Sequence, residues 1–239
     1  MEHEINTAIE GLRSYDFGRS TDWLWAVERL VNDTHGQPDL RRRLESELAM
    51  ALDSDASVAA KQFICEKLWI IGTEASVPAV ARALASRDTH IVEAACYALS
   101  SQTHPAAGKA LREALGKARG LSLVAVINQI GDRRDRESTT RLGVLATDGD
   151  PAIAEAAIAA LGKIGTQDAA RTLSRLSNGL DAGRSVAVAH ALLQCGGELG
   201  RYGKASDASA VYLRLSNSSG NPSIRRGARL ALERLRKQE

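Results

Sequence analysis

A helix-turn-helix segment recurs along this chain about every thirty residues, and residues 148–176, DGDPAIAEAAIAALGKIGTQDAARTLSRL, are its clearest copy. Asp150 is the expected N-cap, and Pro151 suits the first helical position because its missing N–H is not needed there. Apolar residues then follow at steps of three and four, which predicts one buried stripe on a helix of about four turns. We expect Gly165 to end this helix and a shorter second helix to follow Thr166.

The copies align on one aliphatic position near the end of the longer helix. We call these six residues the register positions: Leu68, Leu99, Ile127, Leu161, Leu192 and Leu232. Successive register positions lie 31, 28, 34, 31 and 40 residues apart. The expected helix N-caps recur at Asp88, Asp150, Asp181 and Asn221, and the expected helix ends at Gly72, Gly131, Gly165 and Gly196. Such a period, with two helices per copy, is typical of a solenoid whose copies bury their apolar stripes against their neighbours.

The repeats therefore predict an all-α fold, a right-handed α-solenoid of about six helix pairs. Residues 1–53 are expected to form an N-terminal helical cap or first repeats, and residues 54–239 one continuous repeat array. The composition agrees, because 44% of the residues are hydrophobic while only 4% are aromatic. Small and aliphatic side chains of this kind let helices pack closely.

Charge and hydropathy exclude several classes of protein. The formal net charge is +2, which argues against a dedicated nucleic-acid binder. The sequence shows no signal-peptide pattern and no run of about 20 apolar residues that would span a membrane. We therefore expect a cytoplasmic protein, or an extracytoplasmic one if these residues are an excerpt of a longer chain.

Two stretches carry a family resemblance: KQFICEKLWIIGTEASVPAVARAL at 61–84 and VINQIGDRRD at 126–135. They resemble bacterial HEAT-repeat proteins of uncharacterised function, of the short, phycobilin-lyase-like type, some of which carry extracytoplasmic domains. The resemblance implies an armadillo-like superhelix that binds other proteins. The HEAT consensus often has arginine early in the capped helix, and here the equivalent residues are Lys61, Val92, Gly120, Ala154, Ser185 and Arg225. The missing basic ladder argues against nucleic-acid binding.

In a HEAT array the longer, capped helices line the concave side, so the residues beside their buried stripes form the expected binding groove. These candidates are Glu66, Trp69, Glu93, Tyr97, Asn128, Gln129, His190, Gln194, Arg226 and Arg229. Trp69 stands where the copy at 148–176 has Gly162, so the core does not require a large side chain there. Exposed tryptophan and tyrosine residues are frequent interface hot spots, which makes Trp69 and Tyr97 the leading candidates. The alternative is that Trp69 packs against the N-terminal helices.

Other reactive side chains favour structural roles. Cys65 and Cys96 occupy equivalent positions in neighbouring copies, where small apolar residues stand elsewhere, and Cys195 replaces a core isoleucine, so all three are expected to pack in the core. The histidines lack the spacing of a metal site, so no metal or cofactor is expected: they are His3, His35, His90, His104 and His190. The charged segment 131–138, GDRRDRES, is expected to be a solvated turn in which Asp132 and Asp135 neutralise neighbouring arginines.

Together these observations predict a non-enzymatic scaffold that binds a protein or peptide along its concave face. A ligand-handling protein similar to the bilin lyases is one alternative, for which Glu66, Glu93 and Tyr97 are the available acidic and aromatic set. A nucleic-acid module similar to the HEAT-fold alkylpurine glycosylases is another, but it needs a continuous basic groove. The basic C-terminal helix at 224–237 is expected to be a polar solenoid cap or, alternatively, a docking surface for an acidic partner.

Overall fold

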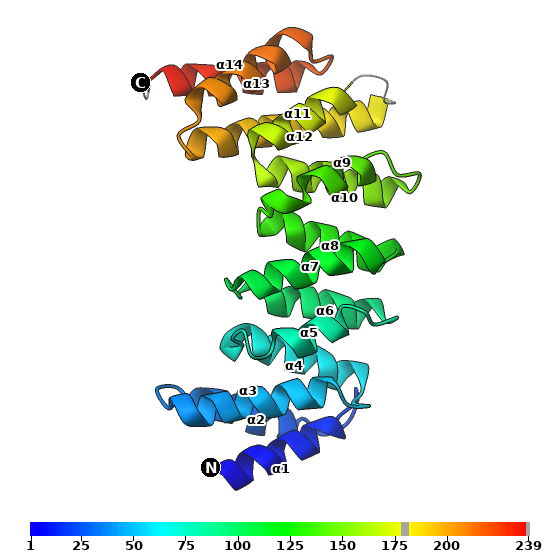
Figure 1. Ribbon diagram of the computed structural model, residues 1–239, viewed down its shortest axis with the longest axis vertical. Coiled ribbons are helices and arrows are strands. Elements are labelled where there is room, and N and C mark those ends of the chain that lie inside the picture. Colours follow the sequence, from blue (N-terminus) through cyan, green and yellow to red (C-terminus); the bar gives the residue numbers. More distant parts are fainter. Residues whose placement is uncertain (178–181, 238–239) are drawn as a thin grey trace. The chain divides into compact units, whose positions relative to one another are not determined.

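The computed structural model describes residues 1–177 and 182–237, which form fourteen α-helices, one 3-10 turn and no strand (Figure 1). This part of the chain divides into two compact units, residues 1–129 and 130–239, and each unit is described by itself. The all-α fold predicted from the repeats is confirmed, whereas the division at residue 53 stays a prediction.

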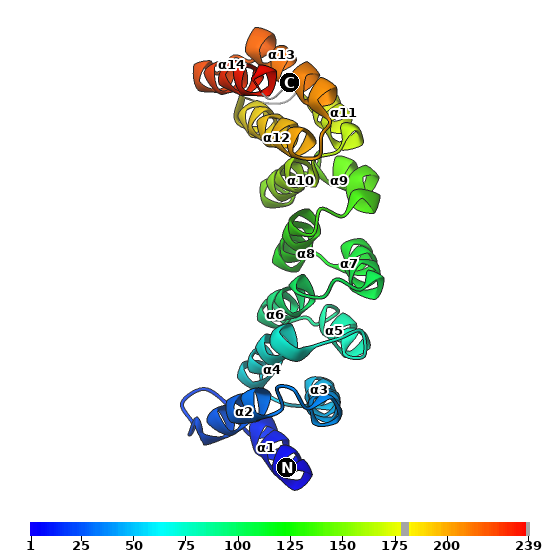
Figure 2. The ribbon, with the colours of Figure 1, turned by 90° about the vertical axis from the view of Figure 1, so that its left-hand side faces the viewer.

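Unit 1 contains the first helices of the chain. Its helices are α1 (Glu2–Arg13), α2 (Asp22–Asp33), α3 (Pro38–Leu52), α4 (Val58–Ile71), α5 (Val77–Ala83), α6 (Thr89–Ser100), α7 (Pro105–Lys117) and the larger part of α8 (Gly120–Asp132). Helix α4 packs on α6, and α5 packs on both α3 and α7. Within this unit α4, α6 and α8 therefore form one row of helices, and α3, α5 and α7 form the other (Figure 2).

Unit 2 repeats this two-row arrangement. After the 3-10 turn η1 (Arg136–Ser138) it contains α9 (Thr139–Leu145), α10 (Pro151–Ile164), α11 (Gln167–Leu176), α12 (Ala182–Arg201), α13 (Ala205–Ser218) and α14 (Pro222–Arg236). Helix α12 packs against α10, α11, α13 and α14. It is therefore the central helix of the unit.

The repeat pattern correctly predicts which residues are buried in the core. Four of the six register positions, Leu68, Leu99, Ile127 and Leu161, are completely buried, and Leu192 and Leu232 are 2% and 9% exposed. Each copy thus buries its register side chain, as a solenoid requires.

The predicted helix caps are confirmed wherever the structure describes them. The side chains of Asp88, Asp150 and Asn221 accept hydrogen bonds from the amides of His90, Ala152 and Ser223, at 2.8, 2.9 and 2.9 Å. Asp181 lies outside the described residues. These bonds satisfy amide groups that have no acceptor within the helix.

Two of the four predicted helix ends are correct. Helix α4 ends before Gly72, and α10 ends at Gly165, whose φ of 62° is the left-handed conformation that glycine adopts most easily. Helix α8 continues through Gly131 to Asp132, and α12 continues through Gly196 to Arg201, so these two predictions are wrong. A Cβ on Gly131 would lie 2.9 Å from Ala160 Cα, so this glycine serves close helix packing instead.

The charged turn after α8 is also different from its prediction. Arg134 pairs with Glu198 on α12, with 3.1 Å from Nη2 to Oε1, and Lys163 Nζ donates to Asp132 Oδ1 at 2.6 Å. The Glu198 side chain is only 8% exposed. Partners on α10 and α12 therefore compensate Asp132 and Arg134, while Arg136 and Glu137 of the same turn are exposed.

Candidate functional site

The two leading aromatic candidates lie against each other on the surface of unit 1. Trp69 on α4 and Tyr97 on α6 are stacked, with ring centroids 5.2 Å apart and an angle of 19° between the ring planes. Each lies one or two positions from a register leucine, so the helical rotation turns it away from the core while the leucine faces inward. The aromatic partner of Trp69 is Tyr97 of the next repeat.

Hydrogen bonds from the end of α6 hold this stack in place. Trp69 Nε1 donates to Ser100 Oγ at 3.0 Å, and Ser101 Oγ donates to the Trp69 carbonyl oxygen at 2.7 Å. The two side chains nevertheless remain 39% and 47% exposed, and the neighbouring Ile70 is 45% exposed. We call Trp69, Ile70 and Tyr97 the aromatic patch. It offers apolar surface whose geometry is fixed before any partner arrives.

A buried lysine organises the charges beside the aromatic patch. Lys67 is 3% exposed, and its Nζ lies 3.0 Å from Glu28 Oε1 and 2.8 Å from Glu66 Oε1. It also lies 4.4 Å from the centroid of the Phe63 ring. One cation thus faces two carboxylates, which leaves this cluster with one excess negative charge.

The acidic side chains of the predicted site border the aromatic patch. Glu66 precedes Trp69 by three residues, and Glu93 precedes Tyr97 by four, so each lies one helical turn away on the same face. Both glutamates are more than half exposed, and His90 Nδ1 lies 4.0 Å from Glu93 Oε2. The border of the patch is therefore acidic at neutral pH.

Sequence reasoning missed two members of this cluster, Glu28 and Lys67. Glu28 lies on α2, 39 residues from Lys67, and no spacing in the repeat connects the two positions. The only signal was a lysine immediately before a register leucine, where the helical rotation brings it close to the buried stripe.

The two predicted site residues on α8, Asn128 and Gln129, differ in their exposure to solvent. Asn128 on α8 is exposed, whereas Gln129 is only 9% exposed. The expectation that Gln129 presents its side chain to a groove is therefore wrong, because one residue of helical rotation carries it toward the core.

The remaining four predicted residues belong to unit 2. His190 and Gln194 are exposed on α12 and line a shallow pocket of about 520 Å³ together with Glu155 and Leu193. Arg226 and Arg229 are exposed on α14. The structure therefore brings Trp69 and Tyr97 together and places these four on a separate unit.

The three cysteines are core residues, as predicted. Cys65, Cys96 and Cys195 are free thiols with exposures of 0%, 4% and 0%. Burial raises the pKa of each thiol to about 12. They are therefore protonated at neutral pH and are not thiolate nucleophiles.

Within residues 1–177 and 182–237, no group of three or more His, Cys, Asp or Glu side chains is arranged to hold a metal ion. Among the helices of residues 1–177 and 182–237, none is long and apolar enough to cross a membrane.

Comparison with known proteins gives one family. HEAT repeats match residues 45–125 and 123–193. The search of curated proteins gave no match.

Several solved structures are similar over most of the chain. Human deoxyhypusine hydroxylase in complex with glycerol is 15% identical, covers 100% of this chain and 97% of its own, and has a TM-score of 0.44. An archaeal HEAT-like repeats protein from Thermococcus onnurineus NA1 is 14% identical, with coverages of 98% and 92% and a TM-score of 0.39. A designed armadillo repeat protein in complex with the peptide (KR)4 is 15% identical, with coverages of 97% and 99% and a TM-score of 0.38.

Proposed function

Because this chain belongs to the HEAT-repeat family, we propose that it is a non-enzymatic scaffold that binds a segment of another protein on the α4 and α6 face of unit 1. Trp69 and Tyr97 are the central contacts, and the acidic side chains around them form the polar rim. This division into an apolar centre and a polar rim is typical of protein interfaces.

The observation that carries this proposal is the exposed, hydrogen-bonded stack of Trp69 and Tyr97. Large aromatic side chains lose little conformational entropy on binding when their rings are already fixed. They also dominate the binding energy of many interfaces, because each can bury about 150–250 Å² of surface. A fixed pair on neighbouring repeats is therefore well suited to hold one side chain of a partner.

The charge around the aromatic patch favours a basic partner. Glu66 and Glu93 border the rings, and Lys67 is already paired with two carboxylates. A guanidinium from the partner could lie over the Tyr97 or Trp69 ring and pair with a glutamate at the same time. The same acidic border disfavours a phosphate backbone, which supports a protein ligand over a nucleic acid.

The test is affinity capture from cells of the source organism, with the full chain as bait. The double variant Trp69→Ala, Tyr97→Ala removes the patch, and Leu121→Ala, Val144→Ala removes two apolar side chains that are 68% and 58% exposed elsewhere. Circular dichroism first establishes that all three proteins have the same helix content. A partner kept by the wild type and the control but lost by the patch variant supports the proposal, and equal retention by all three contradicts it.

A further inference from the structure

A groove of about 490 Å³ lies between α11 and α13 of unit 2, on the outer surface of α12. Its apolar lining includes Ala170, Leu199 and Val211, each less than 10% exposed. The lining residues of α13 are spaced at steps of three and four, so one whole face of that helix borders the groove: these residues are Asp207, Ala210, Val211 and Arg214.

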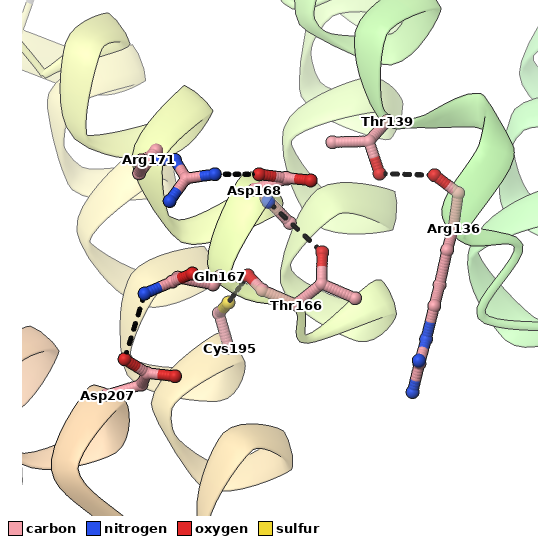
Figure 3. Close-up of polar contacts among 9 residues, drawn as sticks. Arg136, Thr139, Thr166, Gln167, Asp168, Arg171, Cys195 and Asp207 are labelled. Carbon is pink, nitrogen blue, oxygen red and sulfur yellow. Dashed lines mark hydrogen bonds and ion pairs between the residues drawn. The ribbon is translucent and has the colours of Figure 1, made fainter. Parts of the chain in front are cut away.

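Side-chain hydrogen bonds join the two helices at both ends of the groove. Gln167 Nε2 on α11 donates to Asp207 Oδ1 on α13 at 3.1 Å, and Figure 3 shows these two side chains pointing toward each other. At the other end Arg214 Nη2 donates to the Ser174 carbonyl oxygen and to Ser177 Oγ, both at 3.0 Å. The groove is therefore held open at a defined width by bonds at its ends, with apolar surface between them.

The charged side chains that line the groove are mainly basic. They are Arg171, Arg175 and Arg214, with Asp207 as the single acidic residue. Arg171 is paired with Asp168 on its own helix (Figure 3), while Asp207 is engaged by Gln167. Arg175 is exposed and makes no side-chain hydrogen bond or ion pair within residues 1–177 and 182–237. An anion in the groove would therefore meet guanidinium groups with donors to spare.

The corresponding groove between α3 and α5 of unit 1 shows that an excess of basic side chains is not a general feature of the repeat. That groove is smaller, about 240 Å³, and its lining has two arginines, Arg42 and Arg82, and two carboxylates, Glu45 and Asp53. Arg82 pairs with Asp53, and the Glu45 carboxylate accepts hydrogen bonds from the Thr73 and Ser76 amides. All four charged side chains of that groove have partners within the protein, including Arg42, which pairs with Asp39. In the α11 and α13 groove, Arg175 has no such partner within residues 1–177 and 182–237.

We propose that the groove between α11 and α13 is a second binding site, which takes an acidic segment of a partner protein. An aliphatic side chain of that segment lies on Ala170, Leu199 and Val211, and flanking Asp or Glu carboxylates pair with Arg171 and Arg175. Guanidinium groups bind carboxylates through two parallel hydrogen bonds, which gives both affinity and orientation. This site does not depend on the aromatic patch, since it lies in the other unit and selects the opposite charge.

The test is a selection from a displayed library of random peptides against the immobilised full chain, followed by affinity measurements on the selected peptides. The proposal predicts peptides rich in Asp or Glu beside Leu, Ile or Val. Their affinity should fall about tenfold or more in Arg171→Gln, Arg175→Gln, because each lost charge pair weakens binding strongly. Arg87→Gln, at an exposed arginine of unit 1, should leave the affinity unchanged.

Three outcomes would overturn the proposal. Selected peptides could lack acidic residues, or acidic peptides could bind the Arg171→Gln, Arg175→Gln protein as tightly as the wild type. A single-stranded oligonucleotide could also displace the peptides with higher affinity in an arginine-dependent way, which would assign the groove to nucleic acid. The Trp69→Ala, Tyr97→Ala protein keeps its affinity for acidic peptides under this proposal, so failure here and failure of the proposed function are separate results.

Discussion

At Gly196 on α12, the ring of Tyr212 on α13 occupies the space that a side chain would need. A Cβ on Gly196 would lie 2.6 Å from Tyr212 Cε1, and Tyr212 itself is only 5% exposed. The contact explains why a residue with poor helix propensity stands inside α12 rather than at its end.

Replacing Gly196 by alanine should therefore destabilise the protein despite the better helix propensity of alanine. Overpacking of this kind costs about 1–3 kcal/mol. The matched control is Gly116→Ala in α7, where nothing lies within 4 Å of the added Cβ, and it should raise stability by up to about 1 kcal/mol. Denaturant unfolding of both variants measures the difference, and a Gly196→Ala protein as stable as the wild type would contradict the packing account.

The buried thiols give a second prediction at this scale. Burial raises the pKa of Cys65, Cys96 and Cys195 from 9.0 to about 12. A thiol whose pKa is higher in the folded state makes its full contribution to the free energy of unfolding below pH 9. This contribution is lost as the pH rises from 9 toward 12. The free energy of unfolding should therefore fall across that range.

The same thiols should be unreactive in the folded protein. At pH 8 a thiol-specific disulfide reagent should label them only as fast as the protein unfolds, and all three at once in denaturant. Thr103→Cys, at an exposed loop position, provides the control and should react within seconds to minutes. Rapid labelling of the wild-type protein would show that the cysteines are accessible and not part of the core.

At the scale of single helices, the caps are the features that the sequence predicted best. Asp150 accepts a hydrogen bond from the Ala152 amide, and its removal leaves that amide without its acceptor. We expect Asp150→Ala to lower stability by about 1 kcal/mol, because N-cap substitutions typically cost about 0.5–2 kcal/mol. Glu155→Ala, an exposed acidic residue of the same helix, controls for charge and should be nearly neutral. Thermal melting distinguishes the two, and equal effects would argue against the cap.

Helix ends that depend on distant residues could not be predicted in this way. The turn before α5 is held by Glu45 of α3, whose Oε1 accepts from the Thr73 and Ser76 amides at 2.7 and 3.1 Å. Gly131 and Gly196 carry the local signature of a helix end, but their role is close packing against Ala160 and Tyr212. Local spacing does not distinguish a glycine that ends a helix from one that lets another helix approach.

At the scale of the whole molecule, the repeat period was sufficient to predict the fold. Each register residue fills the same position in its copy, so burial of Leu68 implies burial of Leu99 and Leu161. The aromatic pair was predicted only as two separate residues, because Trp69 follows its register leucine by one position and Tyr97 precedes its own by two. Their stacking depends on the packing of α4 on α6, which no single copy contains.

The groove between α11 and α13 was not predicted at all. Its lining combines residues of three helices, and its width depends on how α11 and α13 lie on α12. Charge patterns along one helix could have shown the spacing of Arg171 and Arg175, but not that Leu199 and Arg214 face them. A ligand site between repeats is thus a property of packing, whereas the repeat itself is a property of the sequence.

The most direct test of the central claim is site-specific photo-cross-linking from the aromatic patch. A photoreactive phenylalanine analogue replaces Ile70, which is 45% exposed beside Trp69, and in a control protein it replaces Val144 of unit 2. Illumination in lysate of the source organism should attach a partner segment with basic residues at position 70 and not at 144. The product should disappear when Trp69→Ala is added. Cross-linking that is equal at both positions, or that survives Trp69→Ala, would contradict the claim that this patch binds a partner.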